Sequence, residues 1–213
     1  MPQILKVSAD YSEEYVINSA AAIISRGGVI AYPTETIYGL GADATNEQAI
    51  HRLFEIKGRH FNNPISVIIG DSQDVHPLVC KITAAAQKLM DAFWPGPLTI
   101  VFEAADWVSP LLTANTGKIG IRLSGHDGAR RIALVTGTPL TATSANLSGE
   151  PECADADAVI DQIGDKIDAV IDLGVNGGTV GSTIIDATSE KPIILRSGVI
   201  TREEIEQKTG LKL

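Results

Sequence analysis

Cysteine is scarce in this sequence: only Cys80 and Cys153 occur among 213 residues, far apart and outside any CxxC spacing. This scarcity argues against a disulfide framework and a structural zinc site, and it fits a reducing cytoplasm. The four histidines show no metal-ligand spacing, so we expect no metal held by the chain itself. No apolar run approaches the roughly 20 residues that span a bilayer, and the first residues lack the apolar core of a secretory signal. The composition therefore predicts a cytoplasmic protein without a membrane partner.

Net positive charge is also missing, since 17 lysine and arginine residues face 26 aspartate and glutamate residues and leave a net charge of −9. A general nucleic-acid binder needs a broad positive field to attract phosphates, and this chain does not carry one. Its distinctive motifs nevertheless contain basic residues, while residues 151–173 are strongly acidic. A local positive pocket in an acidic protein suits a small polyanion better than a long duplex.

Three signatures of nucleotide-binding and hydrolytic enzymes are absent or incomplete. The sequence has no GxxxxGK[ST], which excludes a P-loop, and Gly39-x-Gly41 lacks the third glycine of a dinucleotide fingerprint. No GxSxG occurs, and no histidine is placed to activate Ser144. We therefore do not expect Ser144 to be a nucleophile.

The residues that are present alternate between helical patterns and short β-branched runs, which is typical of an α/β layered fold. With 44% apolar residues, residues 1–213 can form one domain with an ordinary core. Thr45 and Gln48 have the spacing of a capping box that opens one helix. We expect helices at residues 13–26, 45–57, 83–93 and 202–209. We expect strands at residues 29–32, 65–69, 118–123, 140–143, 169–173, 182–186 and 193–196.

One predicted strand carries two cations. In residues 118–123 the positions Lys118, Gly120 and Arg122 alternate with apolar residues. Such alternation places both cations on the same face of a sheet. We expect the glycine between them to leave room for a ligand.

Lys57 and Arg59 flank a glycine near the predicted C-terminus of a helix. Lysine supplies a point charge and arginine a planar fork of donors, so the two side chains could converge on a phosphoryl group. The alternative is a solvated helix end, where the helix dipole favours basic residues in any case. Spacing alone leaves both interpretations open.

Three loops could also bind a ligand. Ser144 and Asn146 follow a predicted strand, where ligands often bind in α/β sheets. Residues 33–41 carry three hydroxyl side chains and two glycines, and residues 177–182 contain glycines that would let a phosphate approach the backbone. For each loop, ordinary turn chemistry or a hairpin connection is the open alternative.

Taken together, three stretches resemble the YrdC family of carbamoyl-adenylate-forming enzymes: residues 32–41 (YPTETIYGLG), 57–59 (KGR) and 144–146 (SAN). The order and the run lengths match from about Gly28 to about Gly198. The resemblance implies a twisted mixed β-sheet flanked by helices, with an open concave face that binds ligands, in the family's short single-domain form.

The same resemblance implies a reaction and its partners. Members of the family make L-threonylcarbamoyladenylate and pyrophosphate from L-threonine, bicarbonate or CO2, and ATP, with Mg2+. The product feeds threonylcarbamoylation of tRNA, so the machinery that transfers the group to tRNA is an implied partner.

The resemblance also assigns roles to individual residues. The family's catalytic tetrad corresponds to Lys57, Arg59, Ser144 and Asn146. Its threonine-binding positions correspond to Thr36 and Arg122, and Thr34 is a further candidate. Its nucleotide-binding positions correspond to Arg59, Asn63, Lys118, Ser144 and Arg196, and Ser182 is a further candidate.

Two positions depart from the family pattern. Many relatives carry a histidine that helps to hold threonine where this chain has Ile68, and relatives often carry a serine where it has Glu152. These departures affect the detail of the threonine and nucleotide contacts and leave the reaction class unchanged.

Two other functions stay open at this level. A carbamoyl-adenylate former for another substrate, as in hydrogenase maturation proteins, would be a large chain with zinc-finger cysteines, and this chain has neither the length nor the cysteines. An RNA-binding module would use the concave sheet as a docking surface, but the net charge of −9 predicts weak, steeply salt-sensitive RNA binding. We therefore expect an enzyme that requires no stable nucleic-acid binding.

Overall fold

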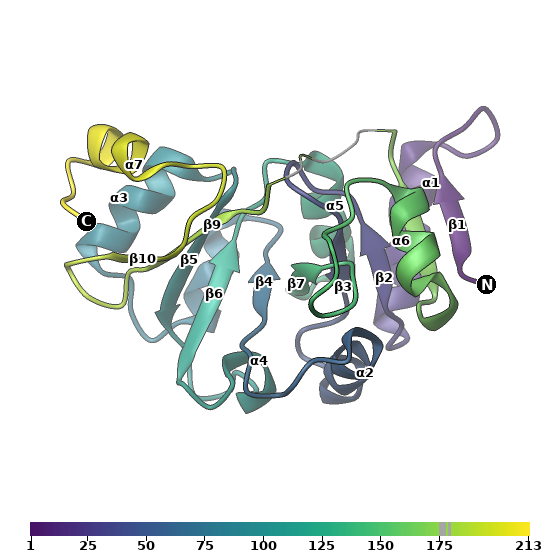
Figure 1. Ribbon diagram of the computed structural model, residues 1–213, viewed down its shortest axis with the longest axis horizontal. Helices are drawn as coiled ribbons and strands as arrows, with labels where there is room; N and C mark the ends of the chain where they lie inside the picture. The colour runs from purple at the N-terminus through teal and green to yellow at the C-terminus, as the bar shows by residue number, and fades with distance from the viewer. Residues whose placement is uncertain (175–177, 179) are drawn as a thin grey trace.

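The computed structural model describes residues 1–174, 178 and 180–213, so Gly177 and Thr179 of the expected glycine-rich loop lie outside the described residues. Within the described residues, ten strands form one open, twisted sheet in the order β1-β8-β2-β3-β7-β4-β6-β5-β9-β10 (Figure 1). The strands are β1 (Gln3–Lys6), β2 (Ile30–Tyr32), β3 (Gly39–Gly41), β4 (Ser66–Ile68), β5 (Leu98–Glu103), β6 (Lys118–Arg122), β7 (Leu140–Ser144), β8 (Ala169–Asp172), β9 (Thr183–Asp186) and β10 (Ile193–Arg196).

Parallel and antiparallel pairs are mixed in this sheet. β8 runs parallel to both of its neighbours, β1 and β2. β3 is antiparallel to β2 and β7, and β4 is antiparallel to β7 but parallel to β6. β5 is antiparallel to β6 and parallel to β9, and β10 closes the series antiparallel to β9. The expected α/β fold with a mixed, twisted sheet is confirmed, and β7 joins its two halves.

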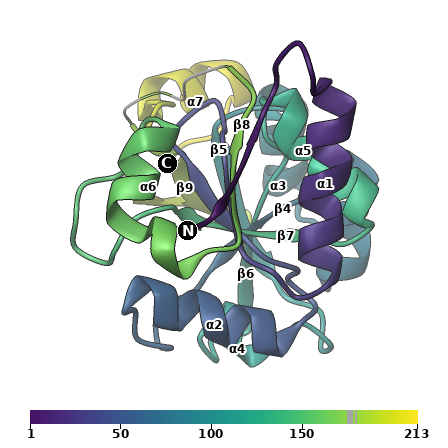
Figure 2. The ribbon, with the colours of Figure 1, turned by 90° about the vertical axis from the view of Figure 1, so that its right-hand side faces the viewer.

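Helices cover both faces of the sheet. α1 and α5 pack against each other on one face, seen on the right in Figure 2, and α6 lies on the opposite face. Ile30 and Tyr32 of β2 belong to the core under α1 and α5, whereas Val29 and Ala31 belong to the core shared with α2 and α6. The helices are α1 (Glu13–Ser25), α2 (Glu47–Lys57), α3 (Ala84–Phe93), α4 (Pro110–Thr113), α5 (Asp127–Thr136), α6 (Ala156–Ile163) and α7 (Arg202–Thr209), with 3-10 helices at Ser72–Leu78 and Gly164–Lys166.

The start of α2 differs from the expected capping box. Asn46, and not Thr45, caps the helix: Asn46 Oδ1 accepts hydrogen bonds from the backbone N–H groups of Gln48 at 3.0 Å and Ala49 at 3.2 Å. The Thr45 hydroxyl instead donates to Asp43 Oδ1 at 2.7 Å. The predicted capping box of Thr45 and Gln48 is therefore wrong, because an amide oxygen one residue later already satisfies the free N–H groups of the first turn.

β3 lies within residues 33–41, which the sequence predicts as a loop. Its two glycines make room for the ring of Tyr32 on the adjacent strand. A Cβ atom at Gly41 would lie 2.6 Å from Tyr32 Cε1, and one at Gly39 would lie 2.9 Å from Tyr32 Cζ. These glycines therefore serve the packing of an aromatic side chain, which is 0% exposed.

Apolar length is limited in every described helix. None of the helices in the described part of the chain is long and apolar enough to cross a membrane.

Candidate active site

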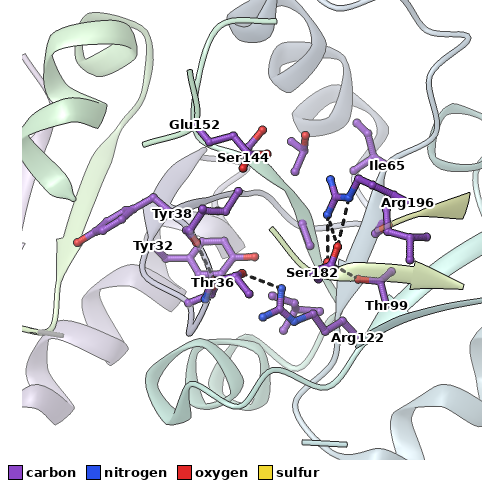
Figure 3. Close-up of a pocket in the computed structure, with 18 of the residues that line it drawn as sticks. Tyr32, Thr36, Tyr38, Ile65, Thr99, Arg122, Ser144, Glu152, Ser182 and Arg196 are labelled. Atoms are coloured by element: carbon purple, nitrogen blue, oxygen red, sulfur yellow. Dashed lines mark hydrogen bonds between the residues drawn. The ribbon is translucent and has the colours of Figure 1, made fainter. Parts of the chain in front are cut away.

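A cavity lies on the sheet where β7, β4, β6, β5 and β9 run side by side, next to the loop that joins β2 to β3 (Figure 3). It contains about 690 Å³ of space, part of which is open to solvent. Residues far apart in the sequence meet around it. The predicted site residues that line it are Thr34, Thr36, Arg59, Arg122, Ser144, Ser182 and Arg196.

Thr34, Thr36 and Arg122 form one corner of the cavity, here called the Arg122 corner. Thr34 Oγ1 and Thr36 Oγ1 lie 2.9 Å apart, and Arg122 Nη1 donates a hydrogen bond to Thr36 Oγ1 at 3.1 Å. Arg122 is only 6% exposed, and its buried Nη2 lies 2.8 Å from Glu35 Oε1, which supplies a counter-charge. A guanidinium that lines the cavity is suited to bind a carboxylate.

Arg59, Arg196 and Ser182 form the other end of the cavity, here called the Arg59–Arg196 corner. Arg196 Nη2 donates to the carbonyl oxygen of Ser182 at 2.7 Å, and Arg59 Nη1 donates to Thr143 Oγ1 at 3.1 Å. Burial lowers the pKa of both guanidiniums, and the charge of Arg196 lowers the pKa of Arg59 further. Two guanidiniums whose charges disfavour each other are stabilised by an anion between them, and phosphoryl oxygens fit their planar donors.

Lys57 contacts the loop after β7 and does not line the cavity. Its Nζ donates to the carbonyl oxygens of Ser144 at 2.5 Å and Asn146 at 2.9 Å, and to Asn146 Oδ1 at 3.1 Å. These three acceptors match the three donors of an ammonium group. Burial, followed by the charge of Arg59, lowers the pKa of Lys57 to about 8.

The expected convergence of Lys57 and Arg59 on one anion differs from the observed arrangement. Gly58 ends α2 in the left-handed conformation with φ of 59°, so the chain turns between the two cations. Arg59 then lines the cavity, while Lys57 holds both ends of the Ser144–Asn146 loop. Lys57 thus fixes the position of Ser144, whose side chain faces the cavity (Figure 3).

Comparison with known proteins identifies the family. The family profile Sua5_yciO_yrdC, described as "Telomere recombination", matches residues 22–198. The chain belongs to the Sua5/YciO/YrdC family. A crystal structure of Pyrococcus abyssi Sua5 complexed with L-threonine matches the fold with a TM-score of 0.90 and 36% identity, over 99% of this chain and 61% of that chain.

Two curated relatives within the Sua5/YciO/YrdC family carry the name threonylcarbamoyl-AMP synthase. The protein of Pyrococcus abyssi is 38% identical over 198 residues, which are 93% of this chain and 58% of the relative. The protein of Bacillus subtilis is 38% identical over 195 residues, which are 91% of this chain and 56% of the relative. The chain therefore spans little more than half the length of these relatives.

Two positions that the family resemblance assigns to the nucleotide do not line the cavity. Asn63 is exposed, and its Nδ2 donates to the carbonyl oxygen of His60 at 3.3 Å. Lys118 Nζ lies 2.7 Å from Asp186 Oδ2 in an ion pair. Lys118 shares a face of β6 with Arg122, as expected, but of these two cations only Arg122 lines the cavity. Contact of Asn63 and Lys118 with a nucleotide stays a prediction.

The space beside Gly120 is already filled. A Cβ atom at Gly120 would lie 2.5 Å from Ser66 Oγ and 3.2 Å from Thr99 Cγ2. Both of these side chains line the cavity. The expectation that Gly120 leaves room for a ligand is therefore wrong, since its missing side chain accommodates two polar neighbours.

Both departures from the family pattern line the cavity. Ile68 is 1% exposed and packs into the core under α1 and α5. Glu152 lies beside Ser144 in Figure 3 and is the one carboxylate residue among the described residues that line the cavity. Burial lowers the pKa of Arg196, and the charge of Glu152 opposes that change.

Some residues that line the cavity received no role from the sequence. Tyr32 lines the cavity, and its hydroxyl donates to the carbonyl oxygen of Thr141 at 3.1 Å. Thr143 had a signal, because it alternates with Thr141 in a predicted strand and precedes Ser144. Thr99 had none, because it lies on β5, a strand that the sequence pattern does not predict.

Proposed function

We propose that the chain synthesises threonylcarbamoyl-AMP and pyrophosphate from L-threonine, bicarbonate or CO2, and ATP, as a nucleotidyltransferase. The names of the two curated relatives and the threonine complex of Pyrococcus abyssi Sua5 support this function. Because the chain spans 58% and 56% of those relatives, the activity of the whole relatives reaches this chain as a proposal.

The observation that carries the proposal is the joining of two unlike binding corners in one cavity. The Arg122 corner offers a buried guanidinium and hydroxyl groups, which suit the carboxylate and side-chain hydroxyl of threonine. The Arg59–Arg196 corner offers two guanidiniums, which suit phosphate groups. A reaction between an amino-acid derivative and a nucleoside triphosphate needs both corners within one continuous space.

The proposed chemistry needs no covalent enzyme intermediate. The threonine amine attacks CO2 and loses a proton, and a carbamate oxygen then attacks the α-phosphorus of ATP as pyrophosphate leaves. Negative charge builds on the phosphoryl oxygens, and the fixed guanidiniums of Arg59 and Arg196 stabilise it. Ser144 adds a neutral hydrogen-bonding group, while Arg122 and Thr36 hold threonine in place.

Within this proposal, the four residues of the predicted catalytic tetrad divide into two pairs. Arg59 and Ser144 line the cavity, so they can contact substrate directly. Lys57 and Asn146 hold each other through two hydrogen bonds and keep the loop in place behind Ser144. The second pair acts by positioning, since the Lys57 donors are occupied by loop oxygens.

Mg2+ fits this cavity as part of the substrate. Within the described ranges, no group of three or more histidine, cysteine, aspartate or glutamate side chains is arranged to hold a metal ion. Mg2+ keeps several of its waters and binds substrate phosphates, so we propose that it arrives as MgATP.

The same support favours the synthase over the alternatives. An RNA-binding module would require phosphate-binding groups over a broad surface, whereas the paired guanidiniums lie in a cavity of a chain with net charge −9. A carbamoyl-adenylate former for another substrate would share the Arg59–Arg196 corner and differ at the Arg122 corner. We further propose that the product passes, in the cytoplasm, to the machinery that modifies tRNA.

Pyrophosphate release from MgATP tests the proposal, with threonine and bicarbonate each supplied or withheld. We expect release that requires both, together with a product of the mass of threonylcarbamoyl-AMP. Arg59→Ala should lower the rate by about 10²-fold, because it removes a preorganised donor from the developing charge. Arg131→Ala is the matched control, since Arg131 pairs with Glu13 on the surface at 2.8 Å. Release without threonine, or none from the folded protein, would contradict the function.

A further inference from the structure

Glu35 lies behind the Arg122 corner and is absent from the residues that line the cavity. We propose that Glu35 is a positioning residue: it holds the Arg122 guanidinium, which lines the cavity, in the orientation that binds the carboxylate of the amino-acid substrate. This inference rests on the proposed function and adds to it the residue that sets amino-acid affinity.

Glu35 and Arg122 form a buried ion pair. Glu35 Oε1 lies 2.8 Å from Arg122 Nη2, a buried nitrogen with no other partner among the described residues. The carboxylate therefore pairs with Nη2 from outside the cavity lining, so it does not occupy the space for substrate. The other two nitrogens are fixed, since Nη1 donates to Thr36 Oγ1 at 3.1 Å and Nε donates to the carbonyl oxygen of Gly96 at 3.2 Å.

The turn that follows β6 holds Glu35 in place. Its Oε2 accepts a hydrogen bond from Ser124 Oγ at 2.5 Å and one from the backbone N–H of His126 at 3.3 Å. Its Oε1 accepts one from the backbone N–H of Gly125 at 2.6 Å. A Cβ atom at Gly125 would lie 3.1 Å from Glu35 Oε1, so a glycine there lets the turn approach closely. Three donors from the turn between β6 and α5 thus fix the carboxylate.

Glu35 is charged in this environment. Burial alone would raise the pKa of Glu35, but the charge of Arg122, the direct contact with its guanidinium and the hydrogen bonds from Ser124 and Gly125 outweigh it and leave the pKa below its ordinary value. The carboxylate is therefore ionised at neutral pH. A guanidinium that is 6% exposed needs such a counter-charge close by, because an uncompensated buried charge is costly.

Glu35 and the proposed ligand-binding hydroxyl of Thr36 are neighbours in the chain. Thr36 follows Glu35 directly, so the same short segment contacts Arg122 from two sides, through the Glu35 carboxylate and the Thr36 hydroxyl. Loss of the carboxylate charge removes the ion pair between Glu35 and Arg122 and lets the guanidinium rotate. The predicted effect is confined to the Arg122 corner, because neither Arg59 nor Arg196 contacts Glu35 through a hydrogen bond or ion pair in the described part of the chain.

Steady-state kinetics of Glu35→Gln test the proposal. We expect the KM for threonine to rise about tenfold or more, because the variant loses one charged contact. The KM for ATP should stay within about twofold. Glu35→Asp keeps the charge on a shorter side chain and should give an intermediate threonine KM. Glu13→Gln is the matched control, because it breaks a surface ion pair with Arg131 and should change neither constant.

Two further variants separate positioning from general damage. Arg122→Lys combined with Glu35→Gln should be no worse for threonine than Arg122→Lys alone, because Glu35 acts through the guanidinium. Ser124→Ala removes one donor that holds Glu35 and should raise the threonine KM by about threefold without affecting ATP. It keeps the test available if Glu35→Gln does not fold.

The outcomes distinguish this inference from the proposed function. Threonine-dependent turnover in the unmodified protein with an unchanged or lower threonine KM in Glu35→Gln would overturn the positioning role and leave the function standing. Equal rises in the KM for threonine and ATP would also overturn it, since they would indicate general distortion. Absence of threonine-dependent turnover in the unmodified protein would instead overturn the proposed function.

Discussion

At the scale of single residues, Lys57 combines burial with a full set of hydrogen bonds. The side chain is 3% exposed, and its acceptors belong to a loop 87 to 89 residues further along the chain. An ammonium in this position couples the end of α2 to the loop after β7. Burial of the positive charge costs free energy, because it penalises the protonated form of Lys57.

The stability of the chain should therefore depend on pH through Lys57. The pKa of Lys57 is about 8 in the folded chain against an ordinary 10.5, so the folded protein releases this proton at a pH where the unfolded chain still holds it. The free energy of unfolding should consequently rise with pH between these values. Relative to Lys57→Met, the unmodified protein should gain about 2 kcal/mol between about pH 7.5 and about pH 9.5.

Urea unfolding at the two pH values measures this difference. Lys88→Met, which changes an exposed lysine of α3, is the control and should follow the pH dependence of the unmodified protein. Parallel pH dependence in the unmodified protein and in Lys57→Met would contradict the lowered pKa.

Glu152 is a second residue with a testable charge effect. Its carboxylate lines the same cavity as Arg59 and Arg196, so it weakens the attraction of that corner for phosphate. Glu152→Ser should lower the KM for ATP by about threefold, in line with the modest strength of partly solvated charge pairs. Steady-state kinetics measure the change, and Glu150→Ser, an exposed position outside the lining, should leave the constant as it is. A higher KM in Glu152→Ser would show instead that the carboxylate assists nucleotide binding.

At the scale of elements, α2 is important because its C-terminus carries Lys57 and leads to Arg59. Asn46→Ala removes the side-chain cap of this helix and should lower the free energy of unfolding by about 1 kcal/mol. Thr45→Ala should cost clearly less, because the Thr45 hydroxyl contacts Asp43 outside the helix. Thermal or urea unfolding of both variants makes the comparison. A larger loss in Thr45→Ala would restore the capping box that the sequence predicts.

Elements with their own local signals could be predicted from the sequence. α1 has an apolar stripe of Ile17, Ala21 and Ile24 and ends before Gly27, and the structure places it at Glu13–Ser25. α7 was similarly recognisable, with Ile205 buried. Each of these helices is defined by spacing within one short segment, which is what periodicity reports.

Elements defined by their neighbours could not be predicted in this way. β3 consists of Gly39–Gly41, and glycine has little intrinsic preference for strands. It becomes a strand because β2 and β7 pair with it on both sides and because Tyr32 needs the space above its glycines. The register of a strand within a sheet is a property of the whole sheet.

At the scale of the whole molecule, the net negative charge of the chain contrasts with the arginine residues that line the cavity. The net charge of −9 should make binding to tRNA weak at physiological salt and steeply dependent on salt concentration. Fluorescence anisotropy with labelled tRNA between about 50 and 200 mM salt measures this, with the KM for ATP as a reference that changes less. Tight binding of tRNA that persists at the higher salt concentration would contradict the prediction.

The candidate site could be predicted in its members better than in its geometry. Arg59, Arg122, Ser144 and Arg196 all line one cavity, although they come from four different stretches of the chain. Their residue types and motifs could be read along the sequence. The contacts of Lys57, by contrast, depend on where α2 lies relative to β7, which no local pattern records.

The order of the strands has a consequence for the synthesis of the protein on the ribosome. Arg196 lies on β10, which forms one edge of the sheet and follows the other nine strands of the sheet in the sequence, whereas Thr36 and Arg59 are made early. A nascent chain that has emerged only as far as β8 already contains the residues proposed to bind the amino acid. It still lacks the second guanidinium of the Arg59–Arg196 corner. Under the proposed function, a growing chain therefore completes its nucleotide site only when β10 pairs with β9, so chains that have not yet reached β10 should consume little ATP.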